Sequence, residues 1–131
     1  MKLTDLKTSD ELLAEQLASD PAFRAEWERT ALARGVAVAL VRYRADRGLA
    51  QKDLGGLLGM TQPQVARLER GDTNPSMETL MRLASGLDIE FTIDVRPAHR
   101  SKPRLVNKSA QTSNVVASAS TADAELLVAA A

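Results

Sequence analysis

The chain has 131 residues, a length that fits one domain with extensions. Hydrophobic residues make up 44% of it but aromatic residues only 3%, so a core must be built mainly from aliphatic side chains. There is no cysteine, which excludes disulfides, thiolate chemistry and a cysteine-based zinc site. The formal net charge is zero, which argues against a general nucleic-acid coat protein.

Charge is unevenly distributed along the chain. Residues 1–28 hold seven acidic and three basic side chains, whereas residues 96–108 hold five basic side chains and no acidic one. This distribution indicates either two different partners or ordinary solvated faces. No apolar run approaches the roughly 18 residues of a membrane span, and no leader pattern precedes the first acidic residues. We therefore expect a cytoplasmic protein, associated with the nucleoid if it binds DNA.

Residues 1–20 predict a short amphipathic helix. Thr8 and Glu11 have the spacing of a capping box at its start. Asp20 and Pro21 begin a second helix, expected to continue to about Arg47 with Gly35 as a site for a break or bend. The apolar side chains of these two helices gather in two stripes: Leu12, Leu13 and Leu17 in the first, then Leu32, Val36, Leu40 and Tyr43.

Phe23 and Trp27 lie one helical turn apart on the second predicted helix. The interpretation we favour is that they pack the N-terminal helix onto the domain that follows. The alternative is an exposed apolar surface for a partner protein. We keep the partner interpretation for the N-terminal segment around them.

Residues 49–71 contain two short helical patterns that meet at Gly59, where a tight turn requires the left-handed conformation. Thr61 and Gln64 form a capping box for the second pattern, and Gly71 ends it. The first pattern places Leu54, Leu57 and Leu58 on one face, and the second places Val65 and Leu68 inward and leaves Gln62, Gln64 and Arg67 for a ligand or solvent. This is a helix-turn-helix whose second helix has a polar, amide-rich outer face.

A further helix is expected after Asn74-Pro75-Ser76, with Leu80, Leu83, Ala84 and Leu87 as its inner face. The period then changes to two over residues 88–95, which indicates a half-buried strand with Ile89, Phe91, Ile93 and Val95 on one face. No other segment predicts a strand, and a lone strand leaves backbone groups unpaired. We favour pairing with the same strand of a second chain, which gives a homodimer and a palindromic DNA site. The alternatives are an intramolecular partner or a strand donated to another protein.

Residues 97–131 predict a disordered tail. Residues 101–121 have too little apolar surface to offset chain entropy, and residues 122–131 predict at most a weak terminal helix. The basic part of the tail either adds phosphate contacts or is a plain linker. The lone His99 is expected to be solvated rather than a ligand.

The helix-turn-helix segment resembles the Cro/repressor-type (XRE) regulators. The matching residues are Gln51, Leu54, Gly55, Gly59, Thr61, Gln62, Val65, Leu68, Glu69, Arg70, Gly71, Pro75, Ser76, Thr79, Leu80, Leu83 and Ala84. The resemblance implies a mainly α protein with a five-helix DNA-binding domain at residues 29–96, including the strand at 88–95. A helical extension at residues 1–28 precedes this domain, and the tail at 97–131 follows it.

The resemblance also implies which side chains meet DNA. Glutamine pairs in a two-pronged way with adenine in the major groove, and arginine pairs with guanine. Gln51 matches the family's phosphate-contacting glutamine, which also steadies Gln62, while Arg44 and Glu69 match its structural ion pair. The base-reading positions are Gln62, Pro63, Gln64 and Arg67, and Lys52, Arg70, Thr73 and Asn74 flank them near the phosphates. Pro63 and the Gly55-Gly56 pair depart from the family pattern, so the bases that are read stay open.

The segment Asp20-Pro21-x-Phe23-x-x-x-Trp27, an XRE domain and an alternating strand are together similar to HigA-type antitoxins. This similarity implies repression of the protein's own operon and neutralisation of a HigB-type, RelE-like mRNA-cleaving toxin. Such small basic toxins suit an acidic N-terminal segment, with Leu12, Leu13 and Leu17 as contact candidates. The alternative is a stand-alone transcriptional repressor. An enzyme is not expected because no catalytic constellation or phosphate cradle appears, and neither a cofactor nor a metal is expected.

Overall fold

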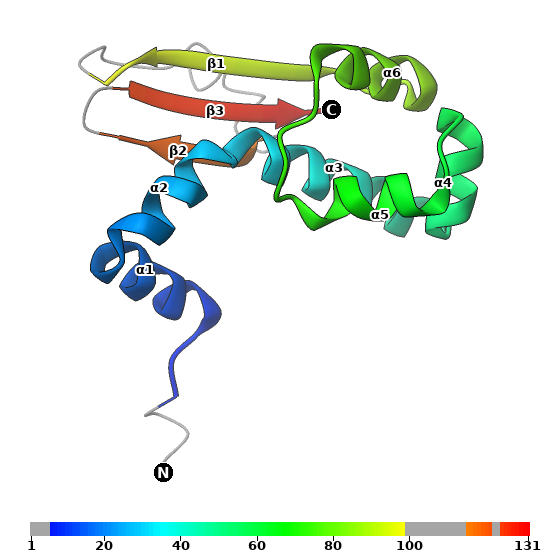
Figure 1. The fold of residues 1–131 in the computed structure, drawn as a ribbon. Coiled ribbons are helices and arrows are strands. Elements are labelled where there is room, and N and C mark those ends of the chain that lie inside the picture. The colour runs from blue at the N-terminus through cyan, green and yellow to red at the C-terminus, as the bar shows by residue number, and fades with distance from the viewer. Residues whose placement is uncertain (1–5, 99–114, 122–123) are drawn as a thin grey trace.

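The computed structural model describes residues 6–98, 115–121 and 124–131. These residues form helices followed by one antiparallel sheet (Figure 1). The helices are α1 (Ser9–Ser19), α2 (Pro21–Arg29), α3 (Ala31–Arg47), α4 (Gln51–Leu58), α5 (Gln62–Arg70) and α6 (Met77–Leu87). The strands are β1 (Phe91–Pro97), β2 (Val115–Ser120) and β3 (Ala124–Ala130).

The core lies between α3, α4, α5 and α6. Aliphatic side chains from all four helices meet there, and Leu40, Leu54, Val65 and Leu83 are fully buried. Leu57 was expected on the inner face of α4 but is 53% exposed, because Leu54 and Leu58, four residues apart, already occupy that face.

The domain expected to hold five helices holds α3 to α6. α6 ends at Asp88, which adopts the left-handed conformation (φ 54°, ψ 47°), and the chain then becomes extended. The strand begins at Phe91 rather than at residue 88, and Ile89 packs against the helical core instead of pairing in the sheet.

The first two helices form an arm that extends away from the other helices (Figure 1). The helix expected from Pro21 to Arg47 is divided at Thr30, not at Gly35. Gly35 is helical and buried, and a Cβ added there would lie 2.9 Å from Cγ1 of Val128. This glycine therefore allows close approach of the sheet rather than a bend.

The sheet has the order β1-β3-β2, so β1 has an intramolecular partner. Phe91 lies opposite Ala130 and Pro97 opposite Ala124, and β2 pairs with the other edge of β3. The predicted disordered tail is therefore wrong for residues 115–120 and 124–130, and the weak terminal helix is instead β3. The premise that β1 lacks a partner in its own chain is also wrong.

Burial explains why the C-terminal segment is a strand. Val128 is fully buried and Ala129 is 5% exposed, and β3 is hydrogen-bonded on both edges. Continuous apolar runs are typical of central strands, where both faces and both edges are covered. His99 and the basic residues at 100–108 lie outside the described residues.

Candidate nucleic-acid interface

The turn between α4 and α5 fixes the angle of the helix-turn-helix. Gly59 has φ 65°, the left-handed conformation that ends α4, and Thr61 caps α5. The Thr61 hydroxyl accepts from the Gln64 N–H (3.3 Å), while the Gln64 carboxamide accepts from the Thr61 N–H (2.8 Å). Val65 anchors the inner face of α5 because it is fully buried. The opposite face is therefore presented outward.

The four residues predicted to read bases all lie exposed on the first two turns of α5: Gln62, Pro63, Gln64 and Arg67. Of the residues expected near phosphates, Gln51 is half-buried and the others are exposed: Lys52, Arg70, Thr73 and Asn74. Arg70 makes an exposed ion pair with Asp72 (3.7 Å). The residues predicted to contact DNA therefore lie on α4, on α5 and in the loop that follows α5.

A polar network holds the start of α5 to α3 and α4. Arg44 donates from Nε (2.7 Å) and Nη2 (2.6 Å) to the two carboxylate oxygens of Glu69. Glu69 also accepts from the Gln51 amide (3.3 Å), and the Gln51 carbonyl accepts from the Gln62 amide (2.7 Å). Gln51 thus links Gln62 to Glu69 at the other end of α5, and Arg44 holds Glu69 in place.

The ion pair at the base of this network is mostly shielded from water. The Glu69 side chain is 6% exposed and that of Arg44 is 23% exposed. The charge-assisted hydrogen bond to Glu69 raises the pKa of Arg44 above its ordinary value. Arg44 also donates to the Leu49 carbonyl (3.1 Å), so one guanidinium joins three segments of the chain.

Asn74 occupies a different environment from the one expected for a phosphate contact. Its Oδ1 accepts from the Ala33 N–H (3.1 Å), and its Nδ2 donates to the Arg29 carbonyl (2.8 Å). Both groups belong to the junction of α2 and α3. The spacing of residues around Asn74 carried no signal for these contacts, because the partners lie more than 40 residues earlier in the chain.

A groove of about 280 Å³ runs beside α5 towards the start of α6. Its lining includes the predicted residues Gln64, Arg67 and Thr73, and also Arg82 from α6. Arg82 was not among the residues expected at this site, because only the apolar inner face of α6 carried a signal in the sequence. The groove therefore adds a second guanidinium beside Arg67.

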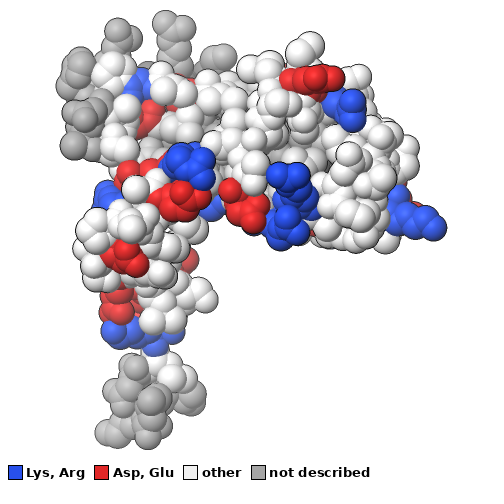
Figure 2. Space-filling view, in the orientation of Figure 1, with Lys and Arg blue, Asp and Glu red and all other residues white. Residues whose placement is uncertain are grey.

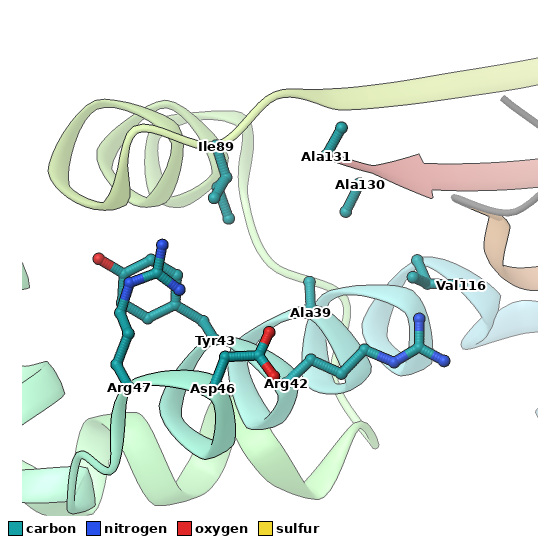
Figure 3. Close-up of a pocket in the computed structure, with 9 residues that line it drawn as sticks. All are labelled: Ala39, Arg42, Tyr43, Asp46, Arg47, Ile89, Val116, Ala130 and Ala131. Carbon is teal, nitrogen blue, oxygen red and sulfur yellow. The ribbon is translucent and has the colours of Figure 1, made fainter. Parts of the chain in front are cut away.

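A second cavity of about 350 Å³ lies between the C-terminal half of α3 and the end of β3 (Figure 3). In it Arg47 stacks on Tyr43, with the guanidinium carbon 3.6 Å from the ring centroid. Ile89, Val116 and Ala130 form apolar parts of the wall. The lining residues come from α3, the α6–β1 connection and the sheet, so this cavity is separate from the outer face of α5.

The charges differ between the arm and the helix-turn-helix. Figure 2 shows acidic side chains along the arm, with a few basic ones among them, and basic side chains beside α5. On the arm, Arg24 pairs with Glu28 (2.9 Å) and Arg29 with Glu26 (2.5 Å). The pairing with Arg29 lowers the pKa of Glu26, first through their hydrogen bond. Over the described arm, residues 6–29, six acidic side chains stand against three basic ones.

Comparison with known proteins identifies the helix-turn-helix. The family model described as Helix-turn-helix matches residues 40–93. An uncharacterized HTH-type transcriptional regulator of Haemophilus influenzae is 43% identical over 54 residues, 41% of this chain and 55% of the relative. Antitoxin HigA1 of Mycobacterium tuberculosis is 33% identical over 92 residues, 68% of this chain and 62% of the relative.

A third relative is an uncharacterized HTH-type transcriptional regulator of Sinorhizobium fredii. It is 36% identical over 56 residues, which are 43% of this chain and 73% of the relative. The chain belongs to the XRE-type helix-turn-helix family of DNA-binding transcriptional regulators. Of the first two relatives it spans less than two thirds of the length.

The comparisons point to no catalytic family. No solved structure gives a significant match. Among the described helices none is both long enough and apolar enough to cross a membrane.

Proposed function

We propose that this regulator is an antitoxin that represses its own operon and neutralises a RelE/HigB-like mRNA-cleaving toxin. The observation that supports this proposal is the length of the alignment with antitoxin HigA1. It covers 92 residues, whereas the helix-turn-helix match covers residues 40–93 only. The similarity therefore extends beyond the DNA-binding segment that any regulator of the family shares. The proposed site of action is the cytoplasm, at the nucleoid.

In this proposal α5 enters the major groove of double-stranded DNA. Arg67 pairs with guanine and Gln62 with adenine, each contributing about 1–3 kcal/mol of discrimination. Gln62 still has its carbonyl oxygen and one amide hydrogen free, because only one hydrogen is used on Gln51. The remaining contacts, from Gln51, Lys52, Arg70 and Thr73, position the protein on the phosphates.

Gln64 is not proposed to make the two-pronged contact with adenine that a free glutamine side chain can make. Its carboxamide oxygen accepts from the Thr61 N–H, so its two amide hydrogens are the groups left for DNA. Donors select acceptors such as guanine N7 and O6 in the major groove. We therefore expect Gln64 to favour guanine over adenine, and Pro63 to make at most an apolar contact.

The proposed toxin surface lies on the arm. Leu12 is 55% exposed and Leu6 is 57% exposed, and α1 contains no buried residue. Leu13 and Leu17 are half-buried on the same helix. An apolar stripe within an acidic segment suits a small basic partner, because opposite charges speed association and fix orientation.

A homodimer through β1 is also part of the proposal. In the described part of the chain β1 pairs along one edge only, with β3. Ile93 is 39% and Val95 is 69% exposed on this edge strand. Antiparallel pairing of two copies of β1 around a twofold axis would cover both and present two α5 helices to a palindromic operator. A monomer in sedimentation equilibrium at micromolar concentration would refute this part.

The second candidate is a stand-alone transcriptional repressor, supported by the similarity to the Haemophilus and Sinorhizobium relatives, which are HTH-type transcriptional regulators. A toxin-sized reading frame beside the gene separates the candidates. Its induction should arrest growth, and co-expression of this chain should relieve the arrest. Deletion of residues 1–20 should abolish relief, whereas Arg67→Ala should retain it. Relief that survives the deletion would exclude the arm as the toxin surface.

DNA recognition is tested by selection of duplexes from a random pool, followed by gel shifts. Arg67→Ala and Gln64→Ala should lose preference for the selected duplex over random DNA. Both variants should keep the oligomeric state of the parent. Full preference in both would refute the assignment of α5 as the reading helix.

A further inference from the structure

The side chain of Asn74 joins two parts of the chain that are far apart in sequence. Asn74 lies in the loop between α5 and α6, directly after the proposed reading helix. Its carboxamide accepts from the N–H of Ala33 (3.1 Å) and donates to the carbonyl of Arg29 (2.8 Å). These two backbone groups stand on either side of the break between α2 and α3.

In a continuous α-helix the N–H of residue 33 would donate to the carbonyl of residue 29. The Asn74 carboxamide bridges that pair instead. A side chain inserted into the helical hydrogen-bond ladder is a known cause of sharp bends. The backbone departs from helix at this place, since Thr30 has φ −104° and ψ 20°. The insertion therefore accounts for the division of the helix at Thr30.

Neighbouring groups complete the junction. The hydroxyl of Thr30 donates to the carbonyl of Glu26 (2.8 Å), and Arg34 donates to the carbonyl of Trp27. The Arg34 guanidinium also lies 3.7 Å from the centroid of the Trp27 ring, and its burial there lowers the pKa of Arg34. The junction is thus a specific structure rather than a frayed helix end.

The loop that carries Asn74 is held firmly against α3. Gly71 has φ 69°, and a Cβ added there would lie 3.3 Å from Cβ of Ala37 and 3.4 Å from Cα of Arg34. This close approach leaves the loop little room to move relative to α3. The position of Asn74 is therefore determined by α5 and α3 together.

We propose that Asn74 is a positioning residue that sets the angle between the arm and the helix-turn-helix. Through this residue, DNA beside the loop and a protein bound to the arm act on the same joint, so each changes the affinity for the other. The coupling between DNA and the partner of the arm rests on the proposed function. The positioning of the arm by Asn74 concerns the free protein and does not rest on it.

The expected movement is large enough to measure. The nine residues of α2 span about 13 Å, so a change of about 20° at the joint displaces the end of α1 by about 5 Å. The chain contains no cysteine, so Ser19→Cys and Ser85→Cys provide two unique spin-label sites, both exposed. Pulsed electron double resonance then reports the distance between arm and core.

Without DNA, Asn74→Ala should shift the label distance by several Å or broaden its distribution, because Ala33 and Arg29 are freed to bond directly. Asn74→Asp keeps the acceptor and loses the donor, so its effect should be intermediate. Thr73→Ala is the matched control, since among the described residues the Thr73 hydroxyl bonds only its neighbour Asp72 (3.3 Å), and without DNA it should leave the distribution unchanged. Circular dichroism verifies that each variant is folded. Parental distributions in both Asn74 variants would overturn the positioning role.

Coupling is tested by adding the duplex selected from the random pool. In the parent the label distance should change when DNA binds, and in Asn74→Ala the change should be lost although DNA still binds. Equal changes in both proteins would overturn coupling through Asn74. Failure of any duplex to bind would instead contradict the proposed function, and the DNA-free comparison would still decide the positioning role.

Discussion

Replacement of Arg44 by methionine tests how much the network behind α5 stabilises the fold. Arg44→Met keeps most of the side-chain volume but leaves the Glu69 carboxylate, 6% exposed, with the Gln51 amide as its one remaining partner in the described part of the chain. Removal of one partner from a fully buried pair costs about 3–5 kcal/mol. Because the Arg44 side chain is 23% exposed, water can reach the place of the lost guanidinium and solvate the Glu69 carboxylate in part. We therefore expect a loss of about 2 kcal/mol in the free energy of unfolding.

Urea unfolding measures this loss. With a slope of about 1.5 kcal/mol/M, a loss of about 2 kcal/mol lowers the midpoint by about 1.3 M. The double variant Arg44→Met/Glu69→Leu should recover most of the stability, because no uncompensated charge remains. Arg70→Met on α5, the helix that carries Glu69, is the control and should change stability by less than about 0.5 kcal/mol, because its ion pair is exposed. A double variant as unstable as Arg44→Met alone would refute the reasoning.

Three further predictions concern single substitutions. Gly56→Ala should raise the free energy of unfolding by about 0.5–1 kcal/mol, and the urea midpoint with it, because an added Cβ meets open space. Gly55→Ala should lower the midpoint, because the Cβ would lie 2.5 Å from the Met60 carbonyl oxygen. Gly35→Ala should increase limited proteolysis within β3, because its Cβ would lie against Val128; unchanged cleavage would contradict this. Arg67→Ala should reduce preference for guanine at one operator position by 5- to 150-fold in competition gel shifts, and an unchanged preference at every position would contradict base reading by Arg67.

Helix ends and the turn between α4 and α5 were the parts of the structure that the sequence predicted well. The left-handed Gly59, the end of α5 at Gly71, the Thr61–Gln64 capping box and the start of α6 after Ser76 all occur where expected. These features depend on residues within four positions of one another, so their signal is contained in a short segment. The apolar period of α5 and α6 was equally informative, because each helix buries one face only.

Features set by distant partners were not predictable in the same way. The segment Ala124–Ala130 contains good helix formers, yet it is the central strand of the sheet. Its conformation follows from β1 on one edge, β2 on the other and α3 beneath Val128. Tertiary context overrides local preference in such cases. The lone strand at residues 88–95 was the available clue, because its unpaired backbone required a partner from somewhere.

The amide side chains around α5 are hydrogen-bonded within the protein, which limits the atoms that each can offer to DNA. Gln51, Gln62, Gln64 and Asn74 were all assigned to DNA, yet each also makes a hydrogen bond inside the protein. An amide has both donors and acceptors, so the bonds already made determine which atoms stay free for bases. Asn74 uses both ends of its amide on the α2–α3 junction, and Gln64 uses its oxygen on a cap. Sequence preference should therefore depend on Arg67, the free end of Gln62 and the two free amide hydrogens of Gln64 rather than on the count of amides along the helix.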